Sequence, residues 1–421
     1  MPVQSIKSDI KNIPKLRFLG FSGAWKEDKL EDIATFLKGK GISKDDISEN
    51  GINKCIRYGE LYTTYNEIIK DIKSRTNILK GDSLLSKEND IIIPSSGETA
   101  LDISRVSCVR ENDVLLGGDL NVMRPKNNQS GEFIAYYLSN FKKRDIANLA
   151  QGNSVVHLYA SNLKNLKINI PDYLEQEKIS NFLESIDDWI NNLKSQRENF
   201  ESYKKGTMTE ILTSRYRFPG FNEKWKYVKL ESFAMDKKYS IVDGPFGSQM
   251  KVHEFTTEGI PVLEMEQLDN KQSIKSATRY ISKEKFQTVK RSAVYSGDIL
   301  ISKTGTIGLL GIATAEVNPG IITSRLAKIS INKNMADTAF IFHCLSYLKQ
   351  DGYWTQVSQG GTMQVLGIKM IKDAPIPGIS KLEQQKIGEF LTYIDKVIEL
   401  KNNQIIQAEQ WKKGLMQGLF I

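Results

Sequence analysis

The stretch Leu174-Glu175-Gln176-Glu177-Lys178-Ile179 is the first of a pair, because Leu382-Glu383-Gln384-Gln385-Lys386-Ile387 follows it 208 residues later. Each copy comes after an Ile-Pro step and runs on to an aromatic-Lys-Lys-Gly motif, at Tyr203–Gly206 and Trp411–Gly414. The first copy contains no proline as far as Leu212, and its apolar residues recur in steps of three and four, apart from one position skipped at Gln196. This heptad pattern predicts a long helix that packs along another long helix.

The two predicted helices carry similar apolar seams. The seam positions are Ile179, Phe182, Ile186, Trp189, Leu193, Phe200 and Tyr203 in the first copy, and Ile387, Phe390, Ile394, Val397, Ile405, Ala408, Trp411 and Leu415 in the second. We expect the two helices to pair within the chain, because each then covers the apolar stripe of the other. Pairing between two copies of the chain, and ordinary helix packing with no spacing role, are the alternatives.

A second block is duplicated at a spacing of 200 residues. Nine of the fifteen positions in residues 17–31 are identical to those in residues 217–231, and the matched Trp25 and Trp225 use two of only five tryptophans. Between these borders the two interiors differ, apart from faint matches of Asp90–Ile93 with Asp298–Ile301 and of Gln151-Gly152 with Gln359-Gly360. The chain is therefore a duplicated scaffold with divergent contents, as two related modules would need.

The interiors predict mixed α/β domains. Short β-branched or apolar runs between turns that contain Gly, Ser or Thr predict strands at Ile91–Ile93, Val114–Leu116, Ile299–Ile301 and Ile321–Ile322. Helices are expected near Phe133–Phe141 and Thr338–Leu348. We expect a mixed α+β fold in which two pseudo-symmetric domains, 1–172 and 214–380, are separated by two long, paired, antiparallel coiled-coil helices, 173–213 and 381–421.

Composition narrows the class of function. The 58 Lys and Arg residues against 50 Asp and Glu give a net charge of +8, which suits a polyanionic partner but is weak evidence alone. The three histidines have no second metal ligand at helical spacing, so neither a histidine metal centre nor a serine–histidine hydrolase is expected. The three cysteines show no CxxC spacing. No apolar run reaches the ~18–20 residues of a membrane span, so no membrane association is expected.

Loops that follow the predicted strands carry side chains suited to binding nucleic acid. Hydroxyl groups and Lys303 suit phosphates, Arg57 suits the major-groove edge of guanine, and Glu264 suits the amino group of cytosine. For any single residue, a solvated loop position is the alternative. The candidate DNA-binding residues are Lys40, Arg57, Tyr58, Ser95, Ser96, Glu98, Thr99, Ser248, Gln249, Lys251, Glu264, Glu266, Lys303, Thr304, Thr306 and Arg325.

Near matches to enzyme motifs in this sequence lack required residues. Asp243-Gly244-Pro245-Phe246 resembles the (Asp/Asn/Ser)-Pro-Pro-(Tyr/Phe) motif of amino-methyltransferases, but Gly replaces the first Pro and no glycine-rich cofactor turn accompanies it. Lys303-Thr304-Gly305-Thr306-Ile307-Gly308 lacks the Gly-Lys-Ser/Thr of a phosphate-binding P-loop. No Asp…Glu-x-Lys nuclease cluster occurs in a strand context. We expect no catalytic residue and no metal site.

Across essentially its full length the chain resembles the specificity subunits of type I restriction–modification systems. The motifs that carry the resemblance are the duplicated opening segments Arg17–Trp25 and Arg217–Trp225, the two Leu-Glu-Gln-x-Lys-Ile helix starts, and the closing segment Lys412–Phe420. Inside the domains, Ile56-Arg57-Tyr58-Gly59-Glu60 and Gly244-Pro245-Phe246-Gly247-Ser248 resemble recurrent sequences of the family's target recognition domains.

The resemblance implies a non-catalytic subunit in which each domain reads one half of an asymmetric, interrupted target in double-stranded DNA. The helices would set the distance between the two half-sites. A helix of ~35 residues is ~50 Å long, which corresponds to about one to one and a half turns of DNA. Two modification subunits would bind S-adenosylmethionine and methylate adenine, while restriction subunits would use ATP and Mg. This chain would bind no cofactor itself and would act in the cytoplasm, on the nucleoid. The alternatives are a coiled-coil scaffold with two protein-binding lobes and a single-chain enzyme acting on DNA.

Overall fold

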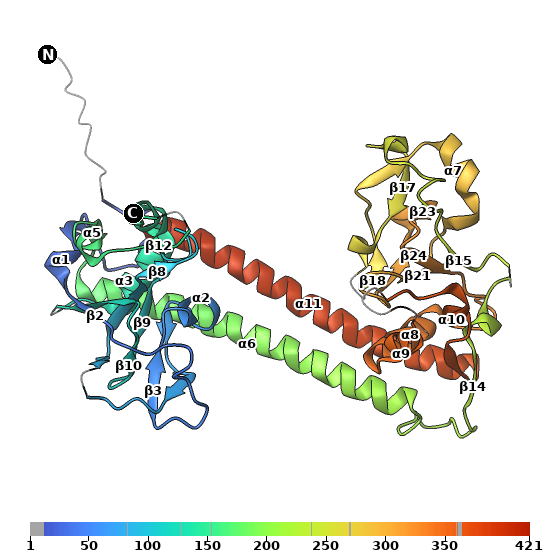
Figure 1. Cartoon of the computed structure of the whole chain (residues 1–421), viewed down its shortest axis with the longest axis horizontal. Coiled ribbons are helices and arrows are strands. Elements are labelled where there is room, and N and C mark those ends of the chain that lie inside the picture. The colour runs from blue at the N-terminus through green and yellow to red at the C-terminus, as the bar shows by residue number, and fades with distance from the viewer. Residues whose placement is uncertain are drawn as a thin grey trace, which may run out of the picture. The chain divides into compact units, whose positions relative to one another are not determined.

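Figure 1 shows the computed structural model, which describes residues 12–81, 83–126, 128–152, 154–236, 238–268, 271–358, 360 and 364–421. The chain divides into two compact units, Met1–Lys194 with Asn403–Ile421 (unit 1) and Ser195–Asn402 (unit 2). Each unit contains one mixed α/β domain and one half of each long helix. Gln359, half of one faint sequence match, lies outside the described residues.

The repeated stretches form the long helices α6 (Tyr173–Leu212) and α11 (Lys381–Leu419), as predicted. Within unit 1 the carboxylate of Asp187 binds the ammonium group of Lys412 at 2.5 Å, and Lys194 binds Glu409 at 2.7 Å. Residue numbers rise along α6 while they fall along α11, so the helices are antiparallel. The pair is intramolecular, which was the favoured prediction.

In unit 2 the same contact is made by the other copy of each motif. The ammonium group of Lys204 binds Asp395 at 2.5 Å. Lys204 and Lys412 belong to the two aromatic-Lys-Lys-Gly motifs, and Asp187 and Asp395 lie 208 residues apart. The repeat therefore encodes both sides of an ion pair between antiparallel helices, and each helix contributes one lysine and one aspartate.

Burial along α6 follows the predicted seam only in part. Ile186 and Leu193 are buried, but Trp189 and Tyr203 are 48% and 54% exposed, so placing these two rings in the seam was wrong. A two-helix pair covers only a narrow stripe, and Ile190 lies in it instead. The wide rings lie at the margin of the stripe and keep one face in water.

An arginine in each opening segment binds the first turn of a long helix. Nε and Nη2 of Arg17 donate to the two carboxylate oxygens of Glu175 at 2.8 and 2.7 Å. In unit 2, Nε and Nη2 of Arg217 donate to Glu383 at 2.9 and 2.8 Å. Both glutamates are buried, and a carboxylate is favoured at a helix N-terminus. The two duplicated blocks are thus partners of each other.

The glutamine that follows each of these glutamates ties the long helix to a helix of the α/β domain. Oε1 of Gln176 accepts the backbone N–H of Ser130 at 2.9 Å, and Oε1 of Gln384 accepts that of Asp337 at 3.0 Å. Ser130 caps α3 (Gly131–Tyr136), and Asp337 caps α8 (Thr338–Gln350). Both α3, continued by a π-helical turn at Tyr137–Phe141, and α8 lie where helices were predicted.

The two domains have unlike sequences but the same sheet topology. One five-stranded sheet in each unit has three antiparallel pairings followed by one parallel pairing. Its strand order in unit 1 is β2 (Ala34–Lys38), β11 (Leu120–Pro125), β7 (Asp90–Pro94), β9 (Ser107–Val109) and β4 (Ile68–Ile69). In unit 2 the order is β15 (Ile241–Asp243), β24 (Leu326–Ile329), β21 (Ile299–Ser302), β22 (Leu310–Ala313) and β18 (Lys271–Ile274).

The second sheets also correspond. In unit 1 the order is β5 (Ser74–Thr76), β3 (Asn53–Ile56), β10 (Leu115–Leu116) and β6 (Leu84–Leu85). In unit 2 it is β19 (Arg279–Ile281), β17 (Ile260–Leu263), β23 (Gly320–Ile322) and β20 (Ala293–Val294), with β16 (Phe255–Thr256) added at the edge of β19. The central pair is parallel in both cases.

Short elements complete the two units. Unit 1 adds the strand pairs β1 (Lys26–Lys29) with β13 (Lys167–Ile170) and β8 (Ser96–Gly97) with β12 (Val156–His157), and helices α1 (Leu30–Ile33), α2 (Glu60–Thr63), α4 (Lys143–Leu149) and α5 (Ala160–Lys164). Unit 2 adds the strand pair β14 (Lys226–Lys229) with β25 (Pro375–Gly378), helices α7 (Lys283–Val289), α9 (Tyr353–Val357) and α10 (Ile368–Lys372), and 3-10 turns at Leu230–Phe233, Val252–Glu254, Met265–Gln267, Lys290–Ser292 and Ala315–Val317.

The largest apolar cluster of each unit contains the phenylalanine three residues after the helix cap. Phe133 packs edge-on against Trp25, and its counterpart Phe340 is fully buried. None of the helices among the described residues combines the length and the hydropathy that crossing a bilayer requires.

Replacing Arg217 by Met should lower the free energy of unfolding of unit 2 by about 3–5 kcal/mol, because the carboxylate of Glu383 would be left buried and unpaired. Urea denaturation followed by circular dichroism measures this loss. The matched control is Arg215→Met, whose exposed ion pair with Glu210 should contribute less than about 1 kcal/mol. Equal losses in the two variants would contradict the anchoring role of Arg217.

His343 should make the stability of unit 2 sensitive to acid. Burial, and to a lesser extent the charge of Lys204, lower the pKa of His343 to about 3. The unfolded chain takes up this proton near pH 6.5, so stability is complete above that pH and falls by roughly 1.4 kcal/mol per pH unit as the pH drops from there towards 3.

The substitution His343→Gln removes this titration, so urea denaturation between pH 7 and 5 should show a flatter profile than that of the original chain. His253→Gln is the control, because His253 is exposed in the same unit and its replacement should leave the slope unchanged. An unaltered slope in the His343 variant would show that another group causes the acid sensitivity.

Candidate nucleic-acid interface

Four loops of unit 1 meet at one edge of the two sheets. They are residues 39–44 after β2, 57–60 after β3, 95–99 after β7, and the turn 117–119 between β10 and β11. Three backbone hydrogen bonds join them at this edge. Gly39 N–H donates to Leu120 O at 3.0 Å, Gly117 N–H to Ile56 O at 2.9 Å, and Ser95 N–H to Asp119 O at 2.8 Å.

Unit 2 repeats this arrangement. Its loops are residues 243–251 after β15, 264–267 after β17, 303–308 after β21, and the turn 323–325 between β23 and β24. Gly244 N–H donates to Leu326 O at 3.3 Å, Thr323 N–H to Leu263 O at 3.2 Å, and Lys303 N–H to Arg325 O at 2.7 Å. We call each set of loops a four-loop surface. Every candidate DNA-binding residue lies on one of these two surfaces.

A glycine at the same topological position allows the loops to approach in each unit. A Cβ atom at Gly39 would stand 1.9 Å from the carbonyl oxygen of Gly117, and one at Gly244 would stand 2.2 Å from that of Thr323. Both distances are too short for any larger residue, so these glycines are required by close backbone packing. This shared feature was not recognised in the sequence, because the loops around it differ.

In unit 1, Arg57 and Tyr58 line a hollow of about 360 Å³ together with residues 41–44 and 117–119. The backbone N–H of Arg57 donates at 2.6 Å to Glu60, whose carboxylate is buried. Among the described residues, no group accepts a hydrogen bond from the buried Nε of Arg57. Glu60 therefore holds the backbone of this loop at Arg57. The neighbouring Lys40 is exposed.

The loop 95–99 contains a polar cluster that the sequence did not reveal. Oγ of Ser96 lies 3.2 Å from Nδ1 of His157 and 3.5 Å from Oδ1 of Asp119, and Tyr62 donates to the Ser96 carbonyl at 2.6 Å. His157 comes from β12, which pairs with β8 from a distant part of the sequence. No local signal could have found it.

The remaining candidates of this loop differ in exposure. Ser95 is buried, and its backbone rather than its side chain contributes to the surface. Glu98 and Thr99 are exposed, although Thr99 Oγ1 already donates to Asp102 at 2.5 Å.

In unit 2, two candidates form ion pairs within the surface. The ammonium group of Lys303 is nearly buried and lies 3.1 Å from the carboxylate of Asp243. Both carboxylate oxygens of Glu264 accept from Arg279, at 2.8 and 2.5 Å. These two ion pairs stabilise the loops. Thr304, another candidate in this unit, is half-buried. The exposed candidates are Ser248, Gln249, Lys251, Glu266, Thr306 and Arg325.

The family model described as "Type I restriction modification DNA specificity domain" matches this chain twice, over residues 23–200 and 222–410. The chain belongs to this family. Both the resemblance drawn from the sequence and the duplicated mixed α/β fold are thereby confirmed, and we call the α/β domains of units 1 and 2 recognition domains 1 and 2.

Individual relatives agree over nearly the whole chain. The chain is 23% identical to the type I restriction enzyme MjaVIII specificity subunit of Methanocaldococcus jannaschii, covering 97% of this chain and 95% of that protein. It is 26% identical to the putative type I restriction enzyme MjaX specificity subunit of the same organism, covering 98% and 91%. The EcoBI specificity subunit of Escherichia coli is 21% identical, covering 63% and 60%.

The fold is also that of a solved structure. The crystal structure of the S subunit of a type I restriction–modification system from M. genitalium superposes with a TM-score of 0.62 at 17% identity, covering 97% of this chain and 99% of that one.

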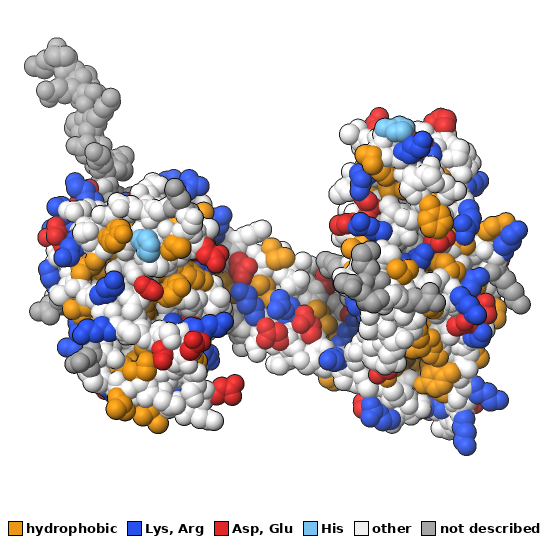
Figure 2. All heavy atoms as spheres, in the orientation of Figure 1, with side chains coloured by type: hydrophobic (Ala, Val, Ile, Leu, Met, Phe, Trp, Pro, Cys, Tyr) orange, Lys and Arg blue, Asp and Glu red, His pale blue; other side chains and the backbone are white. Residues whose placement is uncertain are grey.

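The two recognition domains differ in charge. Residues 14–172 contain 23 Lys and Arg against 21 Asp and Glu, whereas residues 214–380 contain 22 against 15. On the face drawn in Figure 2, basic side chains are spread over both units, with acidic and small apolar groups among them. Recognition domain 2 therefore contributes most of the excess positive charge.

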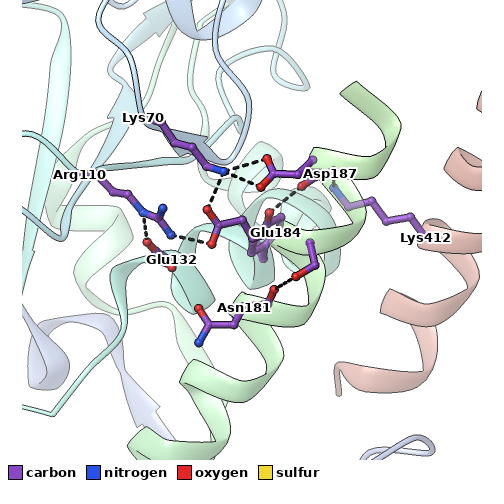
Figure 3. A network of polar contacts seen from close by, with 10 residues as sticks. Lys70, Arg110, Glu132, Asn181, Glu184, Asp187 and Lys412 are labelled. Atoms are coloured by element: carbon purple, nitrogen blue, oxygen red, sulfur yellow. Dashed lines mark hydrogen bonds and ion pairs between the residues drawn. The ribbon is translucent and has the colours of Figure 1, made fainter. Parts of the chain in front are cut away.

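Recognition domain 1 is attached to α6 by an ion-pair network (Figure 3). Lys70 follows β4 and Arg110 follows β9, and because these strands are parallel, their ends lie together. Lys70 binds Glu184 at 2.7 Å and Asp188 at 2.8 Å, while Arg110 binds Glu184 at 2.7 Å. Burial raises the pKa of Glu184, but hydrogen bonds from Arg110 and Lys70 outweigh it and hold the pKa below its ordinary value. The carboxylate of Glu184 is therefore charged at pH 7.

A methyl group at Gly39 or Gly244 should separate the loops of the corresponding surface. We expect Gly39→Ala and Gly244→Ala each to lower the free energy of unfolding by about 1–3 kcal/mol through backbone displacement. Gly247→Ala is the control, because a Cβ there meets nothing within 4 Å. Thermal and urea denaturation check this, and a Gly247 variant as unstable as the Gly244 variant would show that close approach is not the cause.

Proposed function

We propose that this chain is the DNA-specificity subunit of a type I restriction–modification complex and that each recognition domain reads one half of a bipartite, asymmetric target. The observation that carries this is the pair of four-loop surfaces. They have the same strand topology and the same three backbone hydrogen bonds but different side chains. Such a pair of surfaces suits two half-sites of the same geometry and different sequence.

The side chains divide into two roles on this proposal. Buried or ion-paired residues, Ser95, Lys303 and Glu264, shape the loops. Exposed and half-buried residues make the DNA contacts, with hydroxyl, amide and lysine groups binding phosphates and Arg57 reading a guanine edge. The contacting residues on this proposal are Lys40, Arg57, Tyr58, Ser96, Glu98, Thr99, Ser248, Gln249, Lys251, Glu266, Thr304, Thr306 and Arg325.

Catalysis on this proposal belongs to partner subunits. Two modification subunits would bind S-adenosylmethionine and methylate adenine, and restriction subunits would use ATP and Mg to cut unmodified DNA. The duplication supports two copies of one partner. Leu174 and Leu382 hold equivalent positions in the repeat and are 70% and 68% exposed. A leucine exposed twice at the same place has no role in the core, which suits contact with the same partner at both sites.

The alternative is a non-catalytic coiled-coil scaffold with two protein-binding lobes. This hypothesis does not explain why the chain has two surfaces with the same backbone hydrogen bonds that carry hydroxyl, amide and basic side chains. It also predicts that no methylated DNA motif depends on the gene. The subunit proposal predicts the opposite, and it places the protein in the cytoplasm with the nucleoid.

Exchanging residues 14–172 for those of a divergent relative should change one half of the methylated motif and leave the other half intact, because the domains read independently. Long-read mapping of methylated adenines in cells that express each chain measures this. The reciprocal exchange of residues 214–380 is the control and should alter only the other half. A motif that changes in both halves, or one that persists after deletion of the gene, would refute the proposal.

A further inference from the structure

Phe246 lies in the loop that follows β15 and is 61% exposed. In the sequence, Phe246 belongs both to a near match to a methyltransferase motif and to a segment that resembles recurrent target-recognition-domain sequences, and it is not among the candidate DNA-binding residues. Its ring contributes to none of the buried clusters of the described residues. An isolated exposed phenylalanine is ordinary on a protein surface, so its significance depends on how its backbone is held.

On the N-terminal side the loop is anchored through Asp243. The carboxylate of Asp243 accepts from Lys303 at 3.1 Å and from Arg291 at 3.3 Å, and Oγ of Ser292 donates to its carbonyl at 2.7 Å. Asp243 and Lys303 are only 15% and 10% exposed, so solvent screens this pair much less than it screens a surface ion pair. Three separate groups thus hold the residue that begins the loop.

The loop is also held around Phe246 itself. Gly244 packs against the Thr323 carbonyl, and Pro245 restricts the backbone dihedral that precedes Phe246. Beyond the ring, Gln249 N–H donates to Phe246 O at 2.8 Å, and Phe246 N–H donates to Oε1 of Gln249 at 3.2 Å. The backbone is therefore closed into a turn that presents the ring before any ligand arrives.

The neighbours of the ring favour a nucleic-acid ligand over an apolar protein surface. The same four-loop surface carries exposed Ser248, Gln249 and Arg325, and Arg291 is largely exposed behind Asp243. Basic and amide groups suit phosphates, while a rigid aromatic ring suits a base or a base-pair step. Apolar side chains that enter a base step partly unstack it and let the duplex bend towards the protein.

Recognition domain 1 has no aromatic ring at this position. Gly39 corresponds to Gly244, and the residues that follow it are Lys40, Gly41 and Ile42. The feature therefore belongs to one half-site only. We propose that Phe246 is a fixed wedge that inserts at a base-pair step of the half-site read by recognition domain 2. This inference rests on the proposed function and adds a specificity-determining residue to it.

The test uses the full-length chain and a DNA duplex that carries the motif mapped for the original protein. Phe246→Ala should weaken binding on the order of tenfold, as expected for the loss of one stacked ring, and Phe246→Trp should bind nearly as well as the original chain. Neither change removes a cation, so the slope of log affinity against log salt concentration should stay the same. Val252→Ala is the matched control, because it trims another exposed apolar side chain of the same segment.

A second measurement needs no variant. With 2-aminopurine placed at successive positions of the duplex, its fluorescence should rise on binding at one step within the half-site of recognition domain 2, where stacking is lost. A flat profile would overturn the inference. So would an Ala variant that binds as the original does, one that changes the salt slope, or a Val252 variant that loses as much. Failure of the original chain to prefer its mapped motif would instead refute the proposed function.

Discussion

The buried pair between an opening-segment arginine and the first-turn glutamate of a long helix is the contact on which each half of this protein depends. Arg17 with Glu175, and Arg217 with Glu383, join the start of a recognition domain to the start of a helix 158 or 166 residues further along the chain. A buried carboxylate needs such a partner, since the cost of removing it from water would otherwise be large. The glutamine next to it then fixes the capped helix of the domain.

The four-loop surfaces depend on a different kind of interaction, because their geometry comes from the backbone. The loops are tied by main-chain hydrogen bonds and by one glycine that permits close approach, none of which needs a particular side chain on the exposed face. Side chains on that face can therefore change without loss of the loop geometry. This independence explains how two domains with little sequence in common keep the same strand order, and it suits a protein whose role is to hold different recognition residues in the same place.

The two halves are nevertheless not equivalent. In unit 1, Lys70 and Arg110 bind Glu184 on α6, so charge attaches recognition domain 1 to its helix. The corresponding position on α11 is Thr392, which lies 3.3 Å from His343 of α8, a neutral contact inside the packed core. Salt therefore partly screens the ion pairs that attach recognition domain 1 to α6. The contact that attaches recognition domain 2 to α11 is instead sensitive to acid. The two copies of the scaffold therefore differ in the contacts between domain and helix as well as in the loops of the four-loop surfaces.

The sequence by itself was sufficient for the duplication, the long antiparallel helices, the mixed α+β domains and the family, because repeats and heptad spacing are local patterns that survive divergence. It also led to candidate residues that all lie on the two four-loop surfaces, and their contact with DNA remains a prediction. Tertiary structure alone decided which side chains are free: Lys303 and Glu264 are engaged by Asp243 and Arg279, and His157 reaches Ser96 from a distant strand. It also decided that Trp189 lies at the margin of the helix seam rather than in it. These outcomes depend on pairings between segments far apart in the chain, and such pairings leave no periodic trace in the order of residues.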